Sequence, residues 1–318
     1  MTSMANSTIM GKAYEYACLS AFKNIVMTVR PIEIINNESL QIAKGRFESI
    51  SNEEQADMIK SAQAGIQLII NMEPKIVEDG NDTLTVSLQS DDVAKNYGDI
   101  RDILVIRRSI EWEIGISVKH NHAALKHSRL SGVLDFGKSW FGVPCSANYF
   151  DTIKPIFSTL AELHGKKLPW SSINDKAENI YLPLLNAFKD EFINLYEHHD
   201  VTRKLIAYLL GSNGRDYYKL IHHPHKTTVM PFNIFGTLNT KSQTHAPQII
   251  IPPIEWPTRI IEFTFKEDSK TTLILTLNNG WSISFRIHNA SSIVEASLKF
   301  DIQLQSKPEN MFYTEVEW

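Results

Sequence analysis

The sequence predicts a mixed α/β protein with a β-rich C-terminal part, and three observations support this prediction. Helical periodicity covers much of the first 221 residues, an apolar hairpin pattern lies within them, and from residue 222 onward the chain turns to proline-rich turns and short β-runs. The 318 residues, 43% hydrophobic and 21% charged, have ordinary globular composition. We therefore expect two parts, residues 1–221 and residues 222–318, although both could form one compact unit.

The helices are predicted from spacing and from end signals. Residues 11–26 place apolar side chains at helical intervals. Residues 52–71 do the same and open with a polar cap candidate and two acids in the first turn, as the helix dipole favours. The stretch 149–212 is predicted to be mostly helical with a break at KKLPWSS, and LTVSL, residues 84–88, is predicted to be a short strand.

A β-hairpin is predicted in the middle of the first part. Two apolar, β-branched runs, DILVIR and WEIGISVKH, flank the charged break RRSIE. With the turn centred between residues 109 and 110, Asp102 on the first strand is expected opposite Ser117 on the second. This register fixes which side chains can meet across the hairpin.

The alternation of a strand then places Glu113, Ser117 and Lys119 on one face. Lys119 is expected beside Asp102, two residues along from Ser117. Glu113 is expected roughly 13 Å from Ser117, at about 3.3 Å per residue. In an unbulged hairpin, Glu113 and Asp102 therefore should not share a metal ion.

The C-terminal part is predicted from repeated β-runs and one strong turn signal. The pair Asn279-Gly280 stands between two alternating runs, which is the strongest short-range signal for a hairpin. The predicted β-runs are PQIIIPPI, TRIIEFTF, KTTLILTLNNGWSISFRIHN and LKFDIQLQ. We expect this part to pack against the first.

Basic groups gather in two stretches that are poor in acids, although the formal net charge is -4. Between Asp102 and Asp135 the only acids are Glu111 and Glu113, and residues 217–254 contain none. Nucleic-acid binding depends on where charge lies rather than on its sum. The two stretches indicate one cationic surface, with a chance clustering of solvated charge as the alternative.

The rest of the composition indicates a soluble cytoplasmic protein. The first residues, MTSMANSTIM, lack the charged and apolar regions of a signal peptide, and no window approaches the roughly 20 apolar residues of a membrane span. Cys18 and Cys145 lie far apart without partners at zinc spacing, which indicates reduced thiols. We expect no membrane association and no cysteine-bound metal.

The hairpin residues indicate phosphodiester chemistry. Metal-assisted hydrolysis needs carboxylates to hold Mg²⁺ and a cation to stabilise developing charge. An aspartate, a turn and a strand that ends in x-x-Lys form the skeleton of the PD-(D/E)XK nuclease core, but here Ser117 replaces the acid two positions before Lys119. A surface ion pair between Asp102 and Lys119 is the alternative interpretation. The candidates for the second carboxylate are, in order, Glu15, Glu113, Asp99 and Asp135. Glu15 comes first because some members of this nuclease superfamily supply a metal-binding acid from the helix that precedes the core sheet.

The chain resembles the HaeIII-type family of type II restriction endonucleases. The resemblance is carried by GKAYEYACLSAF, by WEIGISVKHNHAALKHSRLS and by GWSISFRIHNASSIVEASLKFDIQLQ, and it extends over nearly the whole chain. It implies a Mg²⁺-dependent endonuclease of the PD-(D/E)XK type, with a mixed sheet flanked by helices, that cuts double-stranded DNA at GGCC. It also implies a methyltransferase that protects the same site. With it, Asp102 and Glu15 become the expected metal ligands, and Asp102, Lys119, Ser117, Glu15 and Glu113 the candidate catalytic residues.

Two segments are predicted to contact DNA. After Lys119, the stretch from His122 to Arg129 is predicted to be helical, with His122, Lys126 and Arg129 on one face toward the phosphates. The second segment lies in or beside FRIHNASS and is the preferred recognition element, because arginine and lysine are the usual donors to guanine. Its candidates are Arg286, His288, Asn289, Ser291, Ser292 and Lys299. Phosphate contacts, or an ordinary ion pair of Arg286, are the alternatives.

Other functions stay open at this level. The missing acid at Ser117 is also compatible with a catalytically inert, sequence-specific DNA-binding protein. An interaction scaffold without a nucleic-acid role, or a repair or structure-specific nuclease with the same core, would give similar local patterns. The oligomeric state is open as well, since a palindromic site can be cut by a homodimer or by a monomer that acts sequentially.

Overall fold

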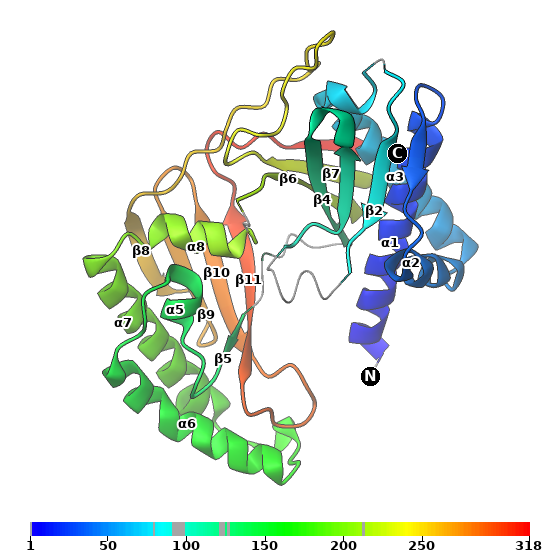
Figure 1. Cartoon of the computed structure of the whole chain (residues 1–318). Helices are drawn as coiled ribbons and strands as arrows, with labels where there is room; N and C mark the ends of the chain where they lie inside the picture. Colours follow the sequence, from blue (N-terminus) through cyan, green and yellow to red (C-terminus); the bar gives the residue numbers. More distant parts are fainter. Residues whose placement is uncertain (1, 79, 91–98, 121–124, 126–127, 212–213) are drawn as a thin grey trace. The chain divides into compact units, whose positions relative to one another are not determined.

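The protein divides into two compact units, each built from separate stretches of chain. The computed structural model describes residues 1–318 except 1, 79, 91–98, 121–124, 126–127 and 212–213 (Figure 1). Unit 1 comprises Met1–Ala123, Ser212–Glu255 and Asn310–Trp318, and unit 2 comprises Ala124–Gly211 and Trp256–Glu309. The boundary expected between residues 221 and 222 falls inside a strand of unit 1. The predicted mixed α/β fold is confirmed.

Unit 1 is a seven-stranded mixed sheet with helices. Its elements are α1 (Thr2–Val26), β1 (Ile32–Ile34), α2 (Glu38–Glu48), α3 (Asn52–Met72), β2 (Leu84–Leu88), β3 (Ile103–Arg107), β4 (Trp112–His120), β6 (Tyr217–His223), β7 (Lys226–Phe232) and β12 (Thr314–Glu317). The strand order is β1-β2-β3-β4-β6-β7-β12. The pairs β1–β2 and β4–β6 are parallel and the others antiparallel.

The two helices, the short strand and the hairpin predicted in unit 1 are confirmed. Helix α3 follows the predicted stretch closely, and its first turn carries a capping box: Ser51 Oγ accepts from Glu54 N–H at 3.3 Å, while Glu54 Oε2 accepts from Ser51 N–H at 2.9 Å. Helix α1 begins nine residues earlier than expected, and α2 and β1 were not predicted.

The core of unit 1 lies between the sheet and its helices. Along β4, Ile114, Ile116 and Val118 are buried in one cluster with Tyr14 of α1 and Ile66 of α3. Because successive strand residues point to opposite faces, Glu113, Ser117 and Lys119 project from the other face. Burial of the apolar side chains of β4 in the core therefore directs its polar side chains to the opposite face of the sheet.

The predicted hairpin register is confirmed. Strands β3 and β4 pair through Ile103↔Ile116 and Val105↔Ile114, and Asp102 N–H donates to Ile116 O at 2.9 Å. A short 3-10 turn, Arg108–Ile110, closes the hairpin, and Glu111 follows at φ 52°. Asp102 therefore stands opposite Ser117, as the centre of the turn predicted.

Unit 2 is a five-stranded antiparallel sheet packed against helices. Its elements are β5 (Arg129–Leu130), α5 (Phe136–Phe141), α6 (Ala147–Gly165), α7 (Leu182–His198), α8 (Thr202–Leu209), β8 (Ile260–Phe265), β9 (Thr272–Leu277), β10 (Ser282–His288) and β11 (Leu298–Ser306), and the strand order is β5-β11-β10-β9-β8 (Figure 1). Aromatic rings join the two layers: Phe188 of α7 lies 5.6 Å from Phe285 of β10 and 5.0 Å from Phe300 of β11, between ring centroids.

Two further predictions are wrong and one is confirmed. The hairpin at Asn279-Gly280 is confirmed: both residues have positive φ, 59° and 79°, as its tight turn requires. PQIIIPPI forms no strand, since adjacent prolines lack the N–H groups that a ladder needs. Arg129 is not helical, because backbone pairing with β11 places it in β5. His122 and Lys126 lie outside the described residues.

In the part of the chain that the structure describes, no helix is both long enough and apolar enough to cross a bilayer.

Glu73 couples the stability of unit 1 to pH. Its carboxyl accepts from Tyr218 Oη at 2.7 Å and from Asn239 N–H at 2.6 Å. Burial raises the pKa of Glu73 from 4.5 to about 7, against these hydrogen bonds. The folded protein thus keeps a proton that the unfolded chain releases, so stability is lost as the pH rises from 4.5 through about 7.

Replacing Glu73 by glutamine is expected to remove this loss, because glutamine resembles the protonated acid. The free energy of unfolding at pH 8 should rise by roughly 1 to 3 kcal/mol, with much less change at pH 4, as measured by denaturant titration. Glu54→Gln is the contrasting control, since its capping hydrogen bonds lower the pKa of Glu54. An equal effect of Glu73→Gln at both pH values would contradict the prediction.

Candidate functional site

The hairpin brings three predicted residues together around one carboxylate. Asp102 directly precedes β3, and its Oδ2 accepts from Val118 N–H at 2.6 Å, from Lys119 Nζ at 3.1 Å and from Ser117 Oγ at 3.4 Å. The side chains of Lys119 and Asp102 are 26% and 23% exposed, so the pair is reachable from solvent. The predicted proximity of Lys119 to Asp102 is confirmed.

Helix α1 supplies a second carboxylate close to the first. Glu15 is 6% exposed and pairs with Lys12 Nζ at 3.1 Å. Burial, followed by the charge of Asp102, raises the pKa of Glu15 to about 8, while Lys12 and Lys119 act in the opposite direction. Two carboxylates that disfavour each other's charge in a buried setting are the electrostatic environment that a divalent cation relieves.

The other candidate carboxylates are engaged elsewhere. Arg101 donates to Asp99 Oδ1 from Nε at 2.8 Å, to Asp99 Oδ2 from Nη2 at 2.7 Å, and to Glu113 Oε1 from Nη1 at 2.7 Å. Arg215 also donates to Glu113. Asp135 caps α5 in unit 2, where its Oδ1 accepts from the N–H of residue 138 at 2.8 Å. Glu15 is thus the candidate acid that lies within the electrostatic reach of Asp102.

Gly115 allows this arrangement. A Cβ atom at position 115 would lie 2.0 Å from Cδ of Arg101, whose side chain crosses β4 at this point. Only glycine leaves room for Arg101 to reach Asp99 and Glu113 together. Because Arg101 directly precedes Asp102, the arginine anchors the backbone that presents the central carboxylate.

The oxygen ligands fit a hard cation. Mg²⁺ prefers octahedral oxygen coordination and is usually held by one or two carboxylates with water and phosphate oxygens. Asp102 and Glu15 supply two carboxylates. Within the described ranges, no group of three or more histidine, cysteine, aspartate or glutamate side chains is placed to hold a metal ion. Any ion at this site would need its further ligands from water or DNA.

A row of basic side chains crosses the sheet of unit 2. Arg129 of β5 pairs with Lys299 of β11, which pairs in turn with His288 of β10. Arg286 lies two residues before His288 on the same face, opposite Asp301, with which it forms an ion pair at 3.4 Å. The alternate residues Leu298 and Phe300 are buried on the helix-covered face. The basic row therefore lies on the face away from the helices.

These basic groups influence one another. The pKa of His288 is lowered by burial first and then by the charges of Arg286 and Lys299. Arg129 is held by Ser297 Oγ, to which its Nε donates at 2.8 Å, and by Glu295 at 3.2 Å. Arg129 thus joins the sheet that carries the predicted recognition residues, instead of a helix beside Lys119.

The polar residues after β10 build a turn. Asn289 Nδ2 donates to Ser291 O at 2.5 Å and to Ile293 O at 2.8 Å, and Asn289 Oδ1 accepts from the N–H of residue 295 at 2.9 Å. Ser292 O accepts from Trp170 N–H at 2.8 Å. Ser291 and Ser292 are exposed, whereas the amide of Asn289 is used to hold the turn.

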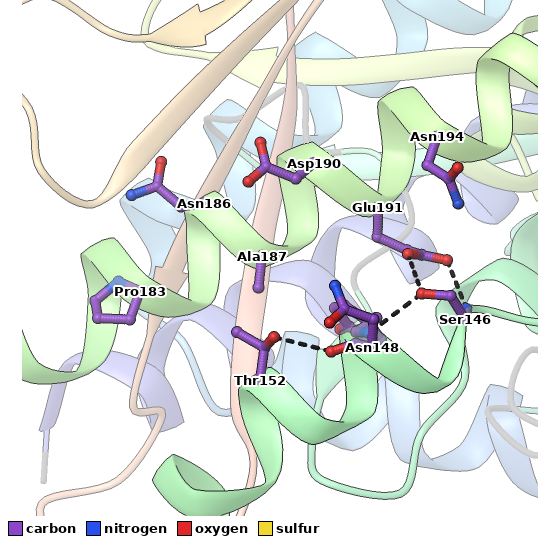
Figure 2. A pocket seen from close by; sticks show the side chains of 10 residues that line it. Ser146, Asn148, Thr152, Pro183, Asn186, Ala187, Asp190, Glu191 and Asn194 are labelled. Carbon is purple, nitrogen blue, oxygen red and sulfur yellow. Dashed lines mark hydrogen bonds between the residues drawn. The ribbon is translucent and has the colours of Figure 1, made fainter.

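A separate pocket lies between α6 and α7 of unit 2 (Figure 2). It has a volume of about 580 Å³ and a polar lining that includes Asn148, Asn186, Asp190 and Glu191. Glu191 accepts from the N–H and the Oγ of Ser146, both at 2.7 Å, at the start of α6. This contact stabilises the helix end, and the two acids disfavour phosphate, so the pocket is not a candidate DNA contact.

Two residues near Asp102 were missed by the sequence analysis. Arg101 had a weak signal, because it directly precedes Asp102. Lys219 of β6 had only its place in the acid-free stretch 217–254, because it stands in the run YYKLIHH and only the parallel pairing of β4 with β6 places it opposite Ser117.

The chain matches one family over nearly its whole length. The family model described as HaeIII restriction endonuclease matches residues 11–308. Type II restriction enzyme HaeIII from Haemophilus aegyptius is 43% identical to the chain over 312 residues, which are 97% of this chain and 97% of that protein. No solved structure matches the chain.

Proposed function

The chain belongs to the HaeIII restriction endonuclease family and is a type II restriction enzyme, a site-specific deoxyribonuclease, and from this premise we propose that it cuts double-stranded DNA at GGCC with Mg²⁺ at Asp102 and Glu15. The family resemblance read from the sequence is thereby confirmed. The observation that carries the proposed site is the contact of Lys119 Nζ with Asp102 Oδ2 at 3.1 Å, with Glu15 close by. The proposed core is of the PD-(D/E)XK type.

Each side chain of the proposed site has its own role in hydrolysis. Asp102 and Glu15 would hold the ion, which would supply polarisation of the phosphate and activation of water. Lys119 turns from Asp102 to the phosphate and stabilises the negative charge that develops there. Ser117 and Val118 N–H keep the carboxylate of Asp102 oriented through their hydrogen bonds. Glu113 is assigned to hold Arg101 and Arg215 rather than a metal ion.

The basic row of unit 2 is proposed to contact the DNA. Arg129, Lys299, His288 and Arg286 share a face that the helices leave open. Arginine and lysine donors match guanine O6 and N7 in the major groove, and they also bind phosphates. His122, Lys126, Ser291 and Ser292 stay proposed as further contacts, and a turn-building role is assigned to Asn289.

The cellular setting follows from the same proposal. The enzyme would act in the cytoplasm together with a methyltransferase that protects GGCC in the host DNA. A palindromic site fits a homodimer in which each copy cuts one strand. Sedimentation of the protein on a GGCC duplex in Ca²⁺ measures whether one or two chains bind.

Mapped plasmid cleavage tests the proposed function. The protein is incubated with Mg²⁺, with Ca²⁺ or with a chelator, and the product ends are sequenced. Ends at GGCC that appear only with Mg²⁺ support the proposal. Ends at another short sequence would overturn the GGCC assignment, and specific binding without strand scission would support a catalytically inert DNA-binding protein.

Arg286→Ala is expected to lower discrimination for GGCC. A base contact is worth roughly 1 to 3 kcal/mol of discrimination, so the preference for GGCC over a site with one changed base should fall about tenfold or more. The measurement is competitive binding in Ca²⁺ with both duplexes. Lys270→Ala is the matched control, because Lys270 is an exposed cation of unit 2 that pairs with Glu178. A uniform loss on both duplexes with a smaller salt dependence would assign Arg286 to a phosphate.

A further inference from the structure

The sheet face that carries Asp102 also carries a buried lysine on the next strand. Lys219 of β6 is 1% exposed and is the register partner of Ser117 in the parallel pair β4–β6. Because register partners on adjacent strands project from the same face, Asp102, Ser117 and Lys219 form one row across three strands. Lys119 lies two residues after Ser117 on β4 and projects from the same face.

Two aromatic rings and a methionine lie beside the buried Lys219. Its Nζ lies 5.8 Å from the ring centroid of Phe232, and Phe232 stacks on Tyr217 with 4.9 Å between ring centroids. On the other side of the row, Lys219 pairs in register with Met230 of β7. A lysine in such surroundings is costly to keep charged, so packing alone does not account for its presence.

Lys219 lies within the electrostatic reach of the candidate catalytic residues. Burial lowers the pKa of Lys219 to about 7, the charge of Lys119 acts in the same direction, and the charge of Asp102 opposes both. Two ammonium groups therefore act on one carboxylate. Of the two, Lys119 is the partly exposed group and Lys219 the buried one.

Lys219, the neighbour of Ser117 on β6, offers a reason why position 117 carries a serine and not an acid. In the nuclease pattern this position carries an acid, and an aspartate here would stand beside Lys219 across the strand spacing of about 4.8 Å. Such an acid would pair with the ammonium group of Lys219 and neutralise its field. A neutral side chain at 117 leaves that field directed at Asp102 and Lys119.

We propose that Lys219 is a positioning residue for DNA cleavage, whose buried ammonium group repels Lys119 toward the exposed side of Asp102 and adds positive potential where charge develops on the phosphate. The inference rests on the proposed roles of Asp102 and Lys119. Positive charge held in a water-poor site stabilises a transition state without reorganisation at the moment of reaction, and a pKa of about 7 leaves a share of the Lys219 side chains charged at neutral pH. Lys219 acts through its two neighbours, since its burial keeps it from the DNA.

Lys219→Met tests the inference, because methionine keeps the length of the side chain and removes the charge. The single-turnover rate of cleavage is expected to fall about a hundredfold, in the range found for one lost electrostatic group. The affinity for a GGCC duplex in Ca²⁺ should change less than threefold, and the thermal midpoint should not fall. Met230→Leu, at the neighbouring position of the same row, is the matched control and should keep the wild-type rate.

Ser117→Asp provides the second test. The introduced acid is expected to pair with Lys219 and to lower the cleavage rate, although it restores the family pattern. Calorimetry with Mn²⁺ supplies a readout independent of cleavage, and no additional ion should bind. Retained cleavage together with an additional Mn²⁺ ion would overturn the inference.

The outcomes separate this inference from the proposed function. A near wild-type rate for Lys219→Met, or a rate loss matched by lost stability or lost DNA affinity, would overturn the role of Lys219 alone. Full cleavage by Lys119→Ala or Asp102→Asn would overturn the proposed site itself. Loss of rate in all three variants, with DNA binding intact in Lys219→Met, supports both.

Discussion

Lys119→Ala is expected to lower the single-turnover rate of DNA cleavage by about a thousandfold, with the fold unchanged. One positive group aimed at developing charge contributes on the order of a hundredfold to a thousandfold to a reaction rate. Lys119 is the partly exposed cation at Asp102 and has no part in the apolar core of unit 1. The measurement is rapid-quench cleavage of a GGCC duplex at saturating protein and Mg²⁺.

A matched control separates the site from general charge effects. Lys226 is also a lysine on a strand of unit 1, but it pairs with Glu315 at the surface, at 3.0 Å. Lys226→Ala should cleave within a fewfold of the wild-type rate. If the two variants cleave equally well, Lys119 belongs to a surface ion pair and the catalytic site must be sought elsewhere.

Asp102→Asn is expected to abolish cleavage to a similar or greater extent and to weaken Mn²⁺ binding at least about tenfold. Asparagine keeps an oxygen that accepts from Val118 N–H, so the hairpin should stay folded, but it loses the charge that attracts a divalent cation. Calorimetry measures the metal affinity and circular dichroism the fold. Unchanged Mn²⁺ affinity in a folded variant would contradict the assignment of Asp102.

Glu15 adds a pH dependence to the same measurement. A carboxylate must lose its proton to bind a metal ion, and burial beside Asp102 raises the pKa of Glu15 to about 8. Wild-type Mn²⁺ affinity should therefore increase as the pH rises from 6 through about 8. In Glu15→Gln this increase should disappear and the affinity should stay low.

Local signals made part of the site predictable. The hairpin register follows from a short turn and two alternating runs, so the meeting of Asp102 with Lys119 needed no information from elsewhere in the chain. The N-terminus of helix α3 was also predictable, because the residues that cap it lie within four consecutive positions of the sequence. Glu15 could be named only because a family resemblance placed it.

Pairings between distant segments were not predictable. Lys219 meets Ser117 because β4 pairs with β6, and these strands are separated by about a hundred residues of chain. Arg129 lies in a strand because β5 pairs with β11, far along the sequence. Periodicity reports which face of an element is apolar, but it does not report which strand lies beside it.

The interlaced path of the chain limits how this enzyme can be altered. The chain passes from one unit to the other after residues 123, 211, 255 and 309, so neither unit corresponds to one continuous stretch. No single cut in the gene yields two fragments that each contain one intact unit, so the sheet of unit 2 cannot be exchanged by joining two fragments end to end. Recombination at any one breakpoint would split unit 1, which favours change of sequence preference by substitutions within the sheet rather than by exchange of modules.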